Sequence, residues 1–282
     1  MPELPEVETI RGQLEKELVG EEIVEVWYDA AKMLKPSPEE FVAGVRGQKV
    51  TGVGRRAKLL IFNLSGGNSF VAHLRMSGQL LIRQQSASAD DYIHVRFKLA
   101  SGRELRFAEP RLFGYAQFLA GPGELAAVLA KYGPEPLDDL DFPTFYQALQ
   151  GTKRAVKAAL LDQHLFSGIG NIYANDALWL AKIHPQRPAA SLSKEEVATL
   201  LAAIEDVLRE GLATKGASDQ WYRDAYGKRG SYQEHFKVYG RTGQPCNECE
   251  TPVERIVVGG RGTFLCPRCQ PRLVSHRPRL VS

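Results

Sequence analysis

The segment YIHVRFKL, residues 92–99, alternates strictly between apolar and polar side chains. An alternation with period two places one set of side chains on each face of a β-strand. We therefore predict a half-buried strand whose apolar set faces a core. That set is Ile93, Val95, Phe97 and Leu99, and the opposite set is Tyr92, His94, Arg96 and Lys98.

The first half of the chain holds several more segments of this kind. Turns rich in Gly, Ser and Asn, such as 65–68 and 100–102, separate several of them. Many short strands joined by short turns are typical of an antiparallel sandwich or barrel. The other predicted strands are EIVEVWY (22–28), KLLIFNL (58–64), FVAHL (70–74) and YAQFL (115–119).

One helix is predicted before these strands. Its apolar residues recur every three or four positions, and Pro5 suits a first helical turn. The apolar positions are Val7, Ile10, Leu14 and Leu18.

The second half is predicted to be helical. The Gly/Pro-rich, acidic segment YGPEPLDDLDFP (132–143) is typical of a linker. After it, residues 193–212 carry one apolar stripe, and Ser193 with Glu196 forms a capping-box pattern. A shorter helix is expected to begin at Asn171 and to follow another helix across the turn QHLFSGIG (163–170). Such a helix start can bind phosphate, although Asn171 as a simple N-cap is the alternative.

All four cysteines lie near the end of the chain, as two C-x2-C pairs separated by 16 residues. This spacing is typical of a zinc ribbon, in which four thiolates close a tetrahedron and leave no position for water. We therefore expect one structural Zn²⁺ rather than a disulfide or a redox pair. The ligands would be Cys246, Cys249, Cys266 and Cys269.

Charge is distributed unevenly along the 282 residues, whose net charge is +3. From Gly211 to the end there are 12 Lys and Arg against 6 Asp and Glu. A basic C-terminal third favours a polyanionic partner, and an ordinary solvated surface is the alternative.

Length and hydropathy predict two compact domains of a soluble intracellular protein. No apolar run approaches the length needed to cross a bilayer, and the acidic start does not match a signal peptide. A monomer is the default expectation.

Seven segments occur together in one order, and the set resembles the formamidopyrimidine-DNA glycosylase family across the chain up to about residue 270. They are PELPEVET (2–9), HLRMSGQL (73–80), EPRLFG (109–114), GPEPL (133–137), SGIGNIYANDAL (167–178), VYGRTGQPC (238–246) and the cysteine ribbon. The resemblance implies a cytoplasmic, nucleoid-associated base-excision repair enzyme that acts on double-stranded damaged DNA. Such an enzyme removes 8-oxoguanine and formamidopyrimidines and then nicks the abasic strand.

The implied fold class is α+β and multidomain. It combines an antiparallel β-sandwich with flanking helices (1–132), a linker (133–141), a helix–two-turn–helix domain with a lesion-recognition loop (142–232) and a zinc finger (233–270). The tail 271–282 is expected to be disordered.

The resemblance also assigns chemistry to the first residues. Once Met1 is removed, Pro2 would carry a free secondary amine, and an α-amino group has a pKa near ~8. Such an amine can attack the sugar C1′ and form an iminium that promotes strand cleavage. By resemblance Pro2 is this nucleophile, and Glu3 is the acid/base residue. Glu8 is expected to be a solvated charge.

Further residues are matched to the family by position. Lys58 and Arg261 complete the catalytic set, with Lys58 contacting the damaged nucleotide's phosphate. Met76, Arg111 and Phe113 would fill the space left by the flipped base, with Arg111 facing the opposite cytosine. The remaining DNA-binding matches are Glu6, His73, Asn171 and Tyr173. Glu6 would also support the amine and the lesion-recognition loop.

Some of these residues have structural alternatives, and some positions depart from the family pattern. The structural alternatives are a strand edge for Lys58, a packed strand residue for His73 and a core residue for Phe113. Leu112 stands where a basic residue is frequent, and Asp176 replaces a common Glu.

Three other functions are weighed against this one. An endonuclease VIII-type enzyme for oxidised pyrimidines shares the Pro–Glu start and the ribbon, but ELPEVE (3–8) and the Met76, Arg111 and Phe113 set argue against it. A non-catalytic damaged-DNA-binding protein would leave Pro2 without a role. An RNA-binding ribbon protein would leave the whole N-terminal segment unexplained.

Overall fold

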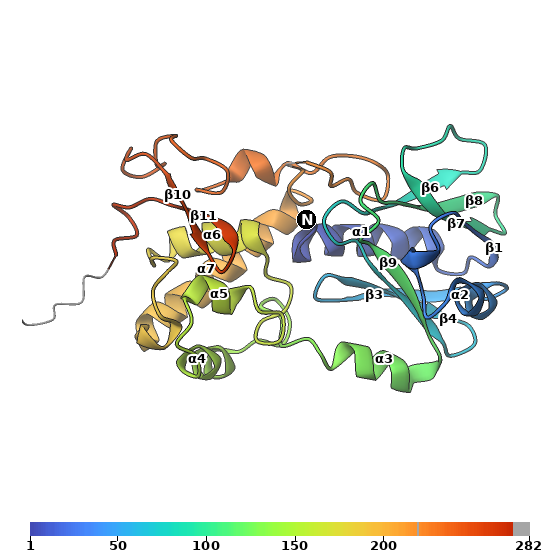
Figure 1. Cartoon of the computed structure of the whole chain (residues 1–282), viewed down its shortest axis with the longest axis horizontal. Coiled ribbons are helices and arrows are strands. Elements are labelled where there is room, and N and C mark those ends of the chain that lie inside the picture. Colours follow the sequence, from blue (N-terminus) through green and yellow to red (C-terminus); the bar gives the residue numbers. More distant parts are fainter. Residues whose placement is uncertain (219, 273–282) are drawn as a thin grey trace, which may run out of the picture. The chain divides into compact units, whose positions relative to one another are not determined.

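The computed structural model describes residues 1–218 and 220–272, so most of the tail predicted to be disordered lies outside it. Two compact units are present, and each is considered separately below (Figure 1). The first comprises Met1–Gly133 with Leu208–His235, and the second comprises Pro134–Val207 with the chain from Phe236 onward.

Two β-sheets form the core of the first unit. One sheet has the strand order β1-β7-β8-β6, with β1 at Ile23–Tyr28, β7 at Ile93–Leu99, β8 at Arg103–Ala108 and β6 at Gln79–Gln84. The other has the order β2-β9-β5-β4-β3, with β2 at Leu34–Lys35, β9 at Tyr115–Leu119, β5 at Ser69–His73, β4 at Leu59–Leu64 and β3 at Val50–Arg56. Buried side chains from both sheets form one cluster, which confirms the predicted sandwich.

The predicted strand 92–99 is β7, and its alternate residues are buried as expected. One pairing departs from an all-antiparallel arrangement, because β2 runs parallel to β9. Strand β4 is buried on both faces, since its outer residues pack against α3 (Gly121–Leu129). This double burial explains why KLLIFNL lacks alternation.

Helix α1, Leu4–Leu18, confirms the predicted N-terminal helix. It packs against β3, and its apolar stripe is fully buried in the sandwich core (Figure 1). Pro5 lies in the first turn, where the missing N–H costs no helical hydrogen bond. A shorter helix, α2 at Pro38–Val45, contributes Phe41 and Val45 to the same core.

The second unit is helical apart from one hairpin. Its helices are α4 at Phe142–Gln150, α5 at Val156–Leu160, α6 at Asn171–Leu180 and the first part of α7, which spans Lys194–Ala213. Ser193 and Glu196 form the predicted capping box of α7, with reciprocal bonds of 3.2 and 2.8 Å. Strands β10 (Glu254–Val258) and β11 (Arg261–Leu265) pair around Gly259–Gly260, which both have positive φ as a tight hairpin turn requires.

The unit boundary differs from the domain ends expected from sequence. The chain from Leu208 to His235 groups with the sandwich rather than with the helical unit. Hydrogen bonds to α1 and β6, described below, account for this grouping.

Candidate nucleic-acid interface and active site

The start of α1 brings Pro2 and Glu3 into a buried position. Glu3 is the N-cap, and its backbone N–H donates to Glu6 Oε2 at 2.7 Å in a capping-box arrangement. Both glutamates are almost completely buried, whereas Met1 is exposed. The helix N-terminus therefore holds the predicted nucleophile and its acid/base partner in one ordered turn.

Glu6 also binds the 215–233 loop, the segment matched to lesion recognition. Its Oε1 accepts the backbone N–H of Ala217 at 2.7 Å. Gly216 precedes this contact with φ +83°, and a Cβ there would lie 2.7 Å from the Glu6 carboxylate. Only glycine therefore fits the close approach between loop and helix.

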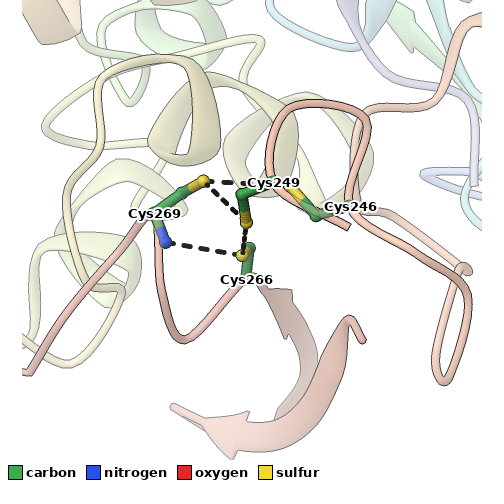
Figure 2. Close-up of side chains that lie close together, drawn as sticks. All are labelled: Cys246, Cys249, Cys266 and Cys269. Carbon is green, nitrogen blue, oxygen red and sulfur yellow. Dashed lines mark hydrogen bonds between the residues drawn. The ribbon is translucent and has the colours of Figure 1, made fainter. Parts of the chain in front are cut away.

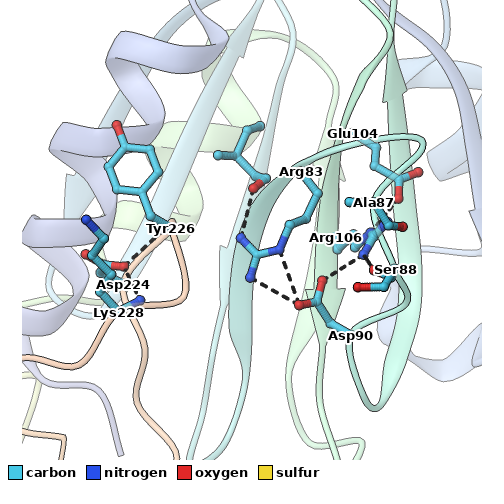
Figure 3. A network of polar contacts seen from close by, with 10 residues as sticks. Arg83, Ala87, Ser88, Asp90, Glu104, Arg106, Asp224, Tyr226 and Lys228 are labelled. Atoms are coloured by element: carbon cyan, nitrogen blue, oxygen red, sulfur yellow. Dashed lines mark hydrogen bonds and ion pairs between the residues drawn. The ribbon is translucent and has the colours of Figure 1, made fainter.

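The same loop is attached to the unit at further points, including Gln13 and Ile82. The Gln13 side chain accepts from Ala225 N–H at 2.8 Å and donates to Asp224 at 2.9 Å. The Ala225 carbonyl accepts from Ile82 N–H at the edge of β6, at 2.9 Å. Asp224 also accepts from the backbone of Tyr226 and Lys228, which closes the turn seen in Figure 3. These attachments hold the described residues of the loop against α1 and β6.

Lys58 lies in the turn between β3 and β4 and is only 6% exposed, so it is not an open strand edge. Ala57 before it has φ +55°, and Arg55 donates to the Ala57 carbonyl at 2.9 Å. Arg55 also pairs with Glu8 at 2.9 Å. The expectation that Glu8 is merely solvated is therefore wrong, because its ion pair supports the turn that carries Lys58.

His73 lies at the end of β5, opposite Leu59 in the register. Burial, together with the charges of Arg75 and Lys58, lowers the pKa of His73 to about 3. The ring is therefore neutral at physiological pH. Its Nδ1 accepts the Arg75 backbone N–H at 2.9 Å, which places the ring proton on Nε2 as a donor.

Met76, Arg111 and Phe113 meet at the surface of the first unit. Arg111 Nη1 lies 3.4 Å from Met76 Sδ, and the Arg111 guanidinium lies 4.9 Å from the centre of the Phe113 ring. Met76 is 43% exposed and Phe113 is 53% exposed, so Phe113 is not a core residue. Clustered exposed apolar side chains are typical of a binding surface. Leu112 between them packs against the core instead.

Asn171 begins α6, but the N-cap is Gly170, so the simple N-cap alternative is wrong. The Asn171 amide donates to the Gly262 carbonyl at 3.1 Å. One turn later, Asn175 accepts the Phe264 N–H at 2.8 Å. The two asparagines, four positions apart on one helix face, therefore hold β11 and the hairpin turn that presents exposed Arg261.

Tyr173 is fully buried within this unit, so its ring presents no surface, and its predicted contact with DNA stays a prediction. Sequence reasoning also missed Lys157, a buried lysine on α5. Its Nζ donates to the Gly262 carbonyl at 2.9 Å and to Thr263 at 2.7 Å. A lysine on the apolar face of a helix was the signal that could have revealed it.

The four cysteine sulfurs lie within 4.8 Å of one another (Figure 2). Three of the pairs are 3.4, 3.5 and 3.8 Å apart. A tetrahedron with Zn–S bonds of about 2.3 Å separates its sulfurs by about 3.8 Å, so the donor set fits one zinc ion. The buried ring of Trp179 packs on this cluster, and its Nε1 has no other hydrogen-bond partner among the described residues. An unpartnered N–H next to four cysteines fits a thiolate cluster, because hydrogen bonds from surrounding groups commonly support metal ligands.

A β-sandwich unit with an ordered Pro–Glu start, a helical unit with a helix–two-turn–helix motif and a four-cysteine ribbon are together the features of a class of DNA glycosylases. Family models match three successive parts of the chain. The formamidopyrimidine-DNA glycosylase N-terminal domain matches residues 1–116, its H2TH domain matches 132–222, and the zinc finger found in FPG and IleRS matches 243–272. The chain belongs to the formamidopyrimidine-DNA glycosylase family.

Individual relatives agree over nearly the whole chain. The formamidopyrimidine-DNA glycosylase of Chloroflexus aurantiacus is 47% identical over 96% of this chain and 98% of its own length. Lactococcus lactis Fpg, solved in complex with abasic-site DNA, superposes with a TM-score of 0.90 at 34% identity, over 96% of this chain and all of that chain. The same enzyme with Fapy-dG DNA gives a TM-score of 0.88 at the same identity and coverage.

In the described part of the chain, no helix is long and apolar enough to cross a membrane.

Proposed function

We propose that this protein is a bifunctional DNA glycosylase and abasic-site lyase that excises oxidised purines, namely 8-oxoguanine and formamidopyrimidines. Family membership over almost the whole chain, together with the buried Pro–Glu start of α1, carries the proposal. The Lactococcus lactis relative bound to Fapy-dG DNA supports a ring-opened purine as a substrate.

The proposed chemistry begins once Met1 is removed and Pro2 has a free amine. The neutral Pro2 nitrogen attacks the deoxyribose C1′, and the C1′–N bond to the base breaks as the base leaves with a proton. Glu3 protonates O4′ as the C1′–O4′ bond breaks, which leaves a C1′=N iminium on Pro2, and Glu3 then moves protons between intermediates. The iminium accepts electrons as a C2′ proton leaves, so the C3′–O bond breaks first and the C5′–O bond second.

We assign supporting roles from position and charge. Lys58 and neutral His73 bind phosphates next to the lesion, His73 through its Nε2–H. Asn171 and Arg261 bind phosphates from the second unit. Phosphate contacts of this kind set register rather than sequence. Four cysteines hold a zinc ion whose role is structural, because no coordination position is left for water or substrate.

A second set of roles concerns the space left by base flipping. Met76 and Phe113 wedge into the stack, and Arg111 donates two hydrogen bonds to the cytosine acceptors.

Segment 133–141 acts as a linker between the units. Since its substrate is DNA, we place the protein at the nucleoid.

Borohydride trapping tests the proposal. The protein is mixed with a duplex that carries 8-oxoguanine opposite cytosine, and reduction of the iminium gives a covalent protein–DNA band. Intact mass first establishes that Met1 is absent. We expect a strong band with the native protein, a much weaker one with Pro2→Gly, and loss of base excision with Glu3→Gln.

Two outcomes would contradict the proposal. No band from a protein lacking Met1 that still binds the duplex would indicate a non-catalytic damage-binding protein. Much faster cleavage of thymine glycol than of 8-oxoguanine would instead indicate an enzyme for oxidised pyrimidines.

A further inference from the structure

Glu109 is a fully buried carboxylate that the proposed chemistry does not use. It follows β8 directly and begins the loop that carries Arg111 and Phe113. Its Oε1 accepts from the Arg111 backbone N–H at 3.1 Å and from the Ser77 hydroxyl, and its Oε2 accepts from the Gly114 N–H at 2.9 Å. A buried carboxylate needs such donors to offset its lost hydration.

These donors come from two loops. Ser77 follows Met76 in the turn between β5 and β6, whereas Arg111 and Gly114 lie on either side of Phe113. One carboxylate therefore joins the loop that carries Met76 to the loop that carries Arg111 and Phe113. The exposed Arg111 side chain also reaches Met76, but Glu109 is the buried group that bonds to donors from both loops.

Both loops hold a non-glycine residue in the left-handed region. Arg75 has φ +54° and Leu112 has φ +54°. Such conformations cost free energy and persist only where surrounding contacts hold the backbone in place. Leu112 is anchored by packing on the core, and its N–H donates to the Glu109 carbonyl at 3.2 Å. Gly114 completes the fit, because a Cβ there would lie 2.8 Å from the Phe107 ring.

We propose that Glu109 is a positioning residue that holds Met76 at a set distance from Arg111 and Phe113, and thereby sets the selectivity for the base opposite the lesion. Because it is fully buried, it acts through the residues it bonds rather than by touching DNA itself. The inference rests on the function proposed above, since it presumes that these three side chains enter the duplex. Arg111 contacts both Met76 and Phe113, so the three side chains form one cluster whose geometry the two loops set.

Glu109→Gln tests this inference. Glutamine has one acceptor oxygen, and its NH₂ group must face an N–H donor that the carboxylate now accepts. The measurement is the ratio of single-turnover excision rates for 8-oxoguanine opposite cytosine and opposite adenine. We expect this ratio to fall roughly tenfold, as for loss of a hydrogen bond to a buried charge. Trapping at a single-stranded abasic site should stay within about twofold, because it needs no opposite base. Glu109→Asp keeps the carboxylate and should restore part of the ratio.

Glu104→Gln is the matched control. Glu104 is another buried carboxylate, on strand β8 just before Glu109, and it pairs with Arg106 in the network of Figure 3, away from both loops. Its loss should lower the unfolding temperature and leave the ratio unchanged. If Glu109→Gln behaves in the same way, Glu109 is only structural and the inference is wrong.

Two further measurements cover the remaining outcomes. If Glu109→Gln does not fold, Ser77→Ala removes one of the three bonds and should lower the ratio by a smaller factor, and an unchanged ratio would overturn the inference. A native protein that gives a trapped band but has no preference for cytosine would refute the inference alone. A native protein with no trapped band would refute the proposed function itself.

Discussion

The carboxylate of Glu6 accepts a 2.7 Å hydrogen bond from the backbone N–H of Ala217, a residue 211 positions further along the chain. Its other oxygen accepts from Glu3 N–H at the same distance. One buried side chain therefore orders the proposed catalytic turn and the loop matched to lesion recognition together. We expect lesion binding at the loop and the position of the nucleophile to depend on each other.

Glu6→Gln should weaken both elements. The amide can keep one of the two acceptor contacts and places an NH₂ group against the other N–H. Loss of a hydrogen bond to a buried charge costs about 1.5–3 kcal/mol. We expect a lower unfolding temperature and, well below it, a roughly tenfold slower single-turnover excision of 8-oxoguanine.

Glu15→Gln on the exposed face of α1 is the control, since Glu15 pairs only with Arg11 among the ion pairs seen. Exposed pairs of this kind contribute little stability, so this variant should match the native protein. Native excision rates in folded Glu6→Gln would show that the link between helix and loop has no part in the reaction.

Asp176 predicts a dependence of stability on pH. The carboxylate is fully buried on α6, and its Oδ1 accepts from Val238 and Tyr239 N–H at 3.0 Å each. Burial raises the pKa of Asp176 to about 6, although the backbone donors oppose this shift. The folded state therefore binds more protons than the unfolded state between pH ~4 and pH ~6, and Asp176 makes the protein less stable as pH rises through that window.

Asp176→Asn should remove this contribution, because its single carbonyl oxygen can accept both N–H groups without carrying a charge. We expect the unfolding temperature of the variant, relative to the native protein, to rise between pH 4 and pH 7. Thermal unfolding monitored by circular dichroism across this range measures the difference. A difference that does not change with pH would contradict the assignment.

Zinc removal should unfold the ribbon of the second unit and leave the first unit folded. Thiolate-bound zinc supplies about 10–16 kcal/mol of folding free energy to small ribbons, and the hairpin carries Arg261. We expect chelation, or Cys249→Ser, to abolish tight binding to duplex DNA. The sandwich should remain folded, because its apolar core contains no ribbon residue.

The measurements for this prediction are DNA affinity by fluorescence anisotropy and strand content by circular dichroism. Added Zn²⁺ should restore binding to the chelated native protein and not to Cys249→Ser. Unchanged affinity in the metal-free protein would show that the ribbon does not contribute to the interface.

Much of this architecture could be read from local pattern. The alternation of 92–99, the stripe of α1 and the Ser193–Glu196 capping box all depend on residues close in sequence, and each was confirmed. The cysteine spacing likewise predicts a cluster, because a CxxC pair brings two thiolates together by local geometry. The strand, the helix, the cap and the cysteine cluster were therefore determined by sequence alone.

Other features depended on contacts between distant segments. The sequence near Glu8 does not predict its ion pair with Arg55. The sequence near Tyr173 does not predict that the ring is buried, and that near Glu109 does not predict its bond from Ser77. The parallel β2–β9 pairing and the attachment of Leu208–His235 to the sandwich are of the same kind. Sequence determined the elements and the candidate chemistry, since periodicity and spacing act within a few residues. Only the tertiary structure decided which buried carboxylates hold that chemistry in place, because a buried charge must find its donors wherever the fold brings them.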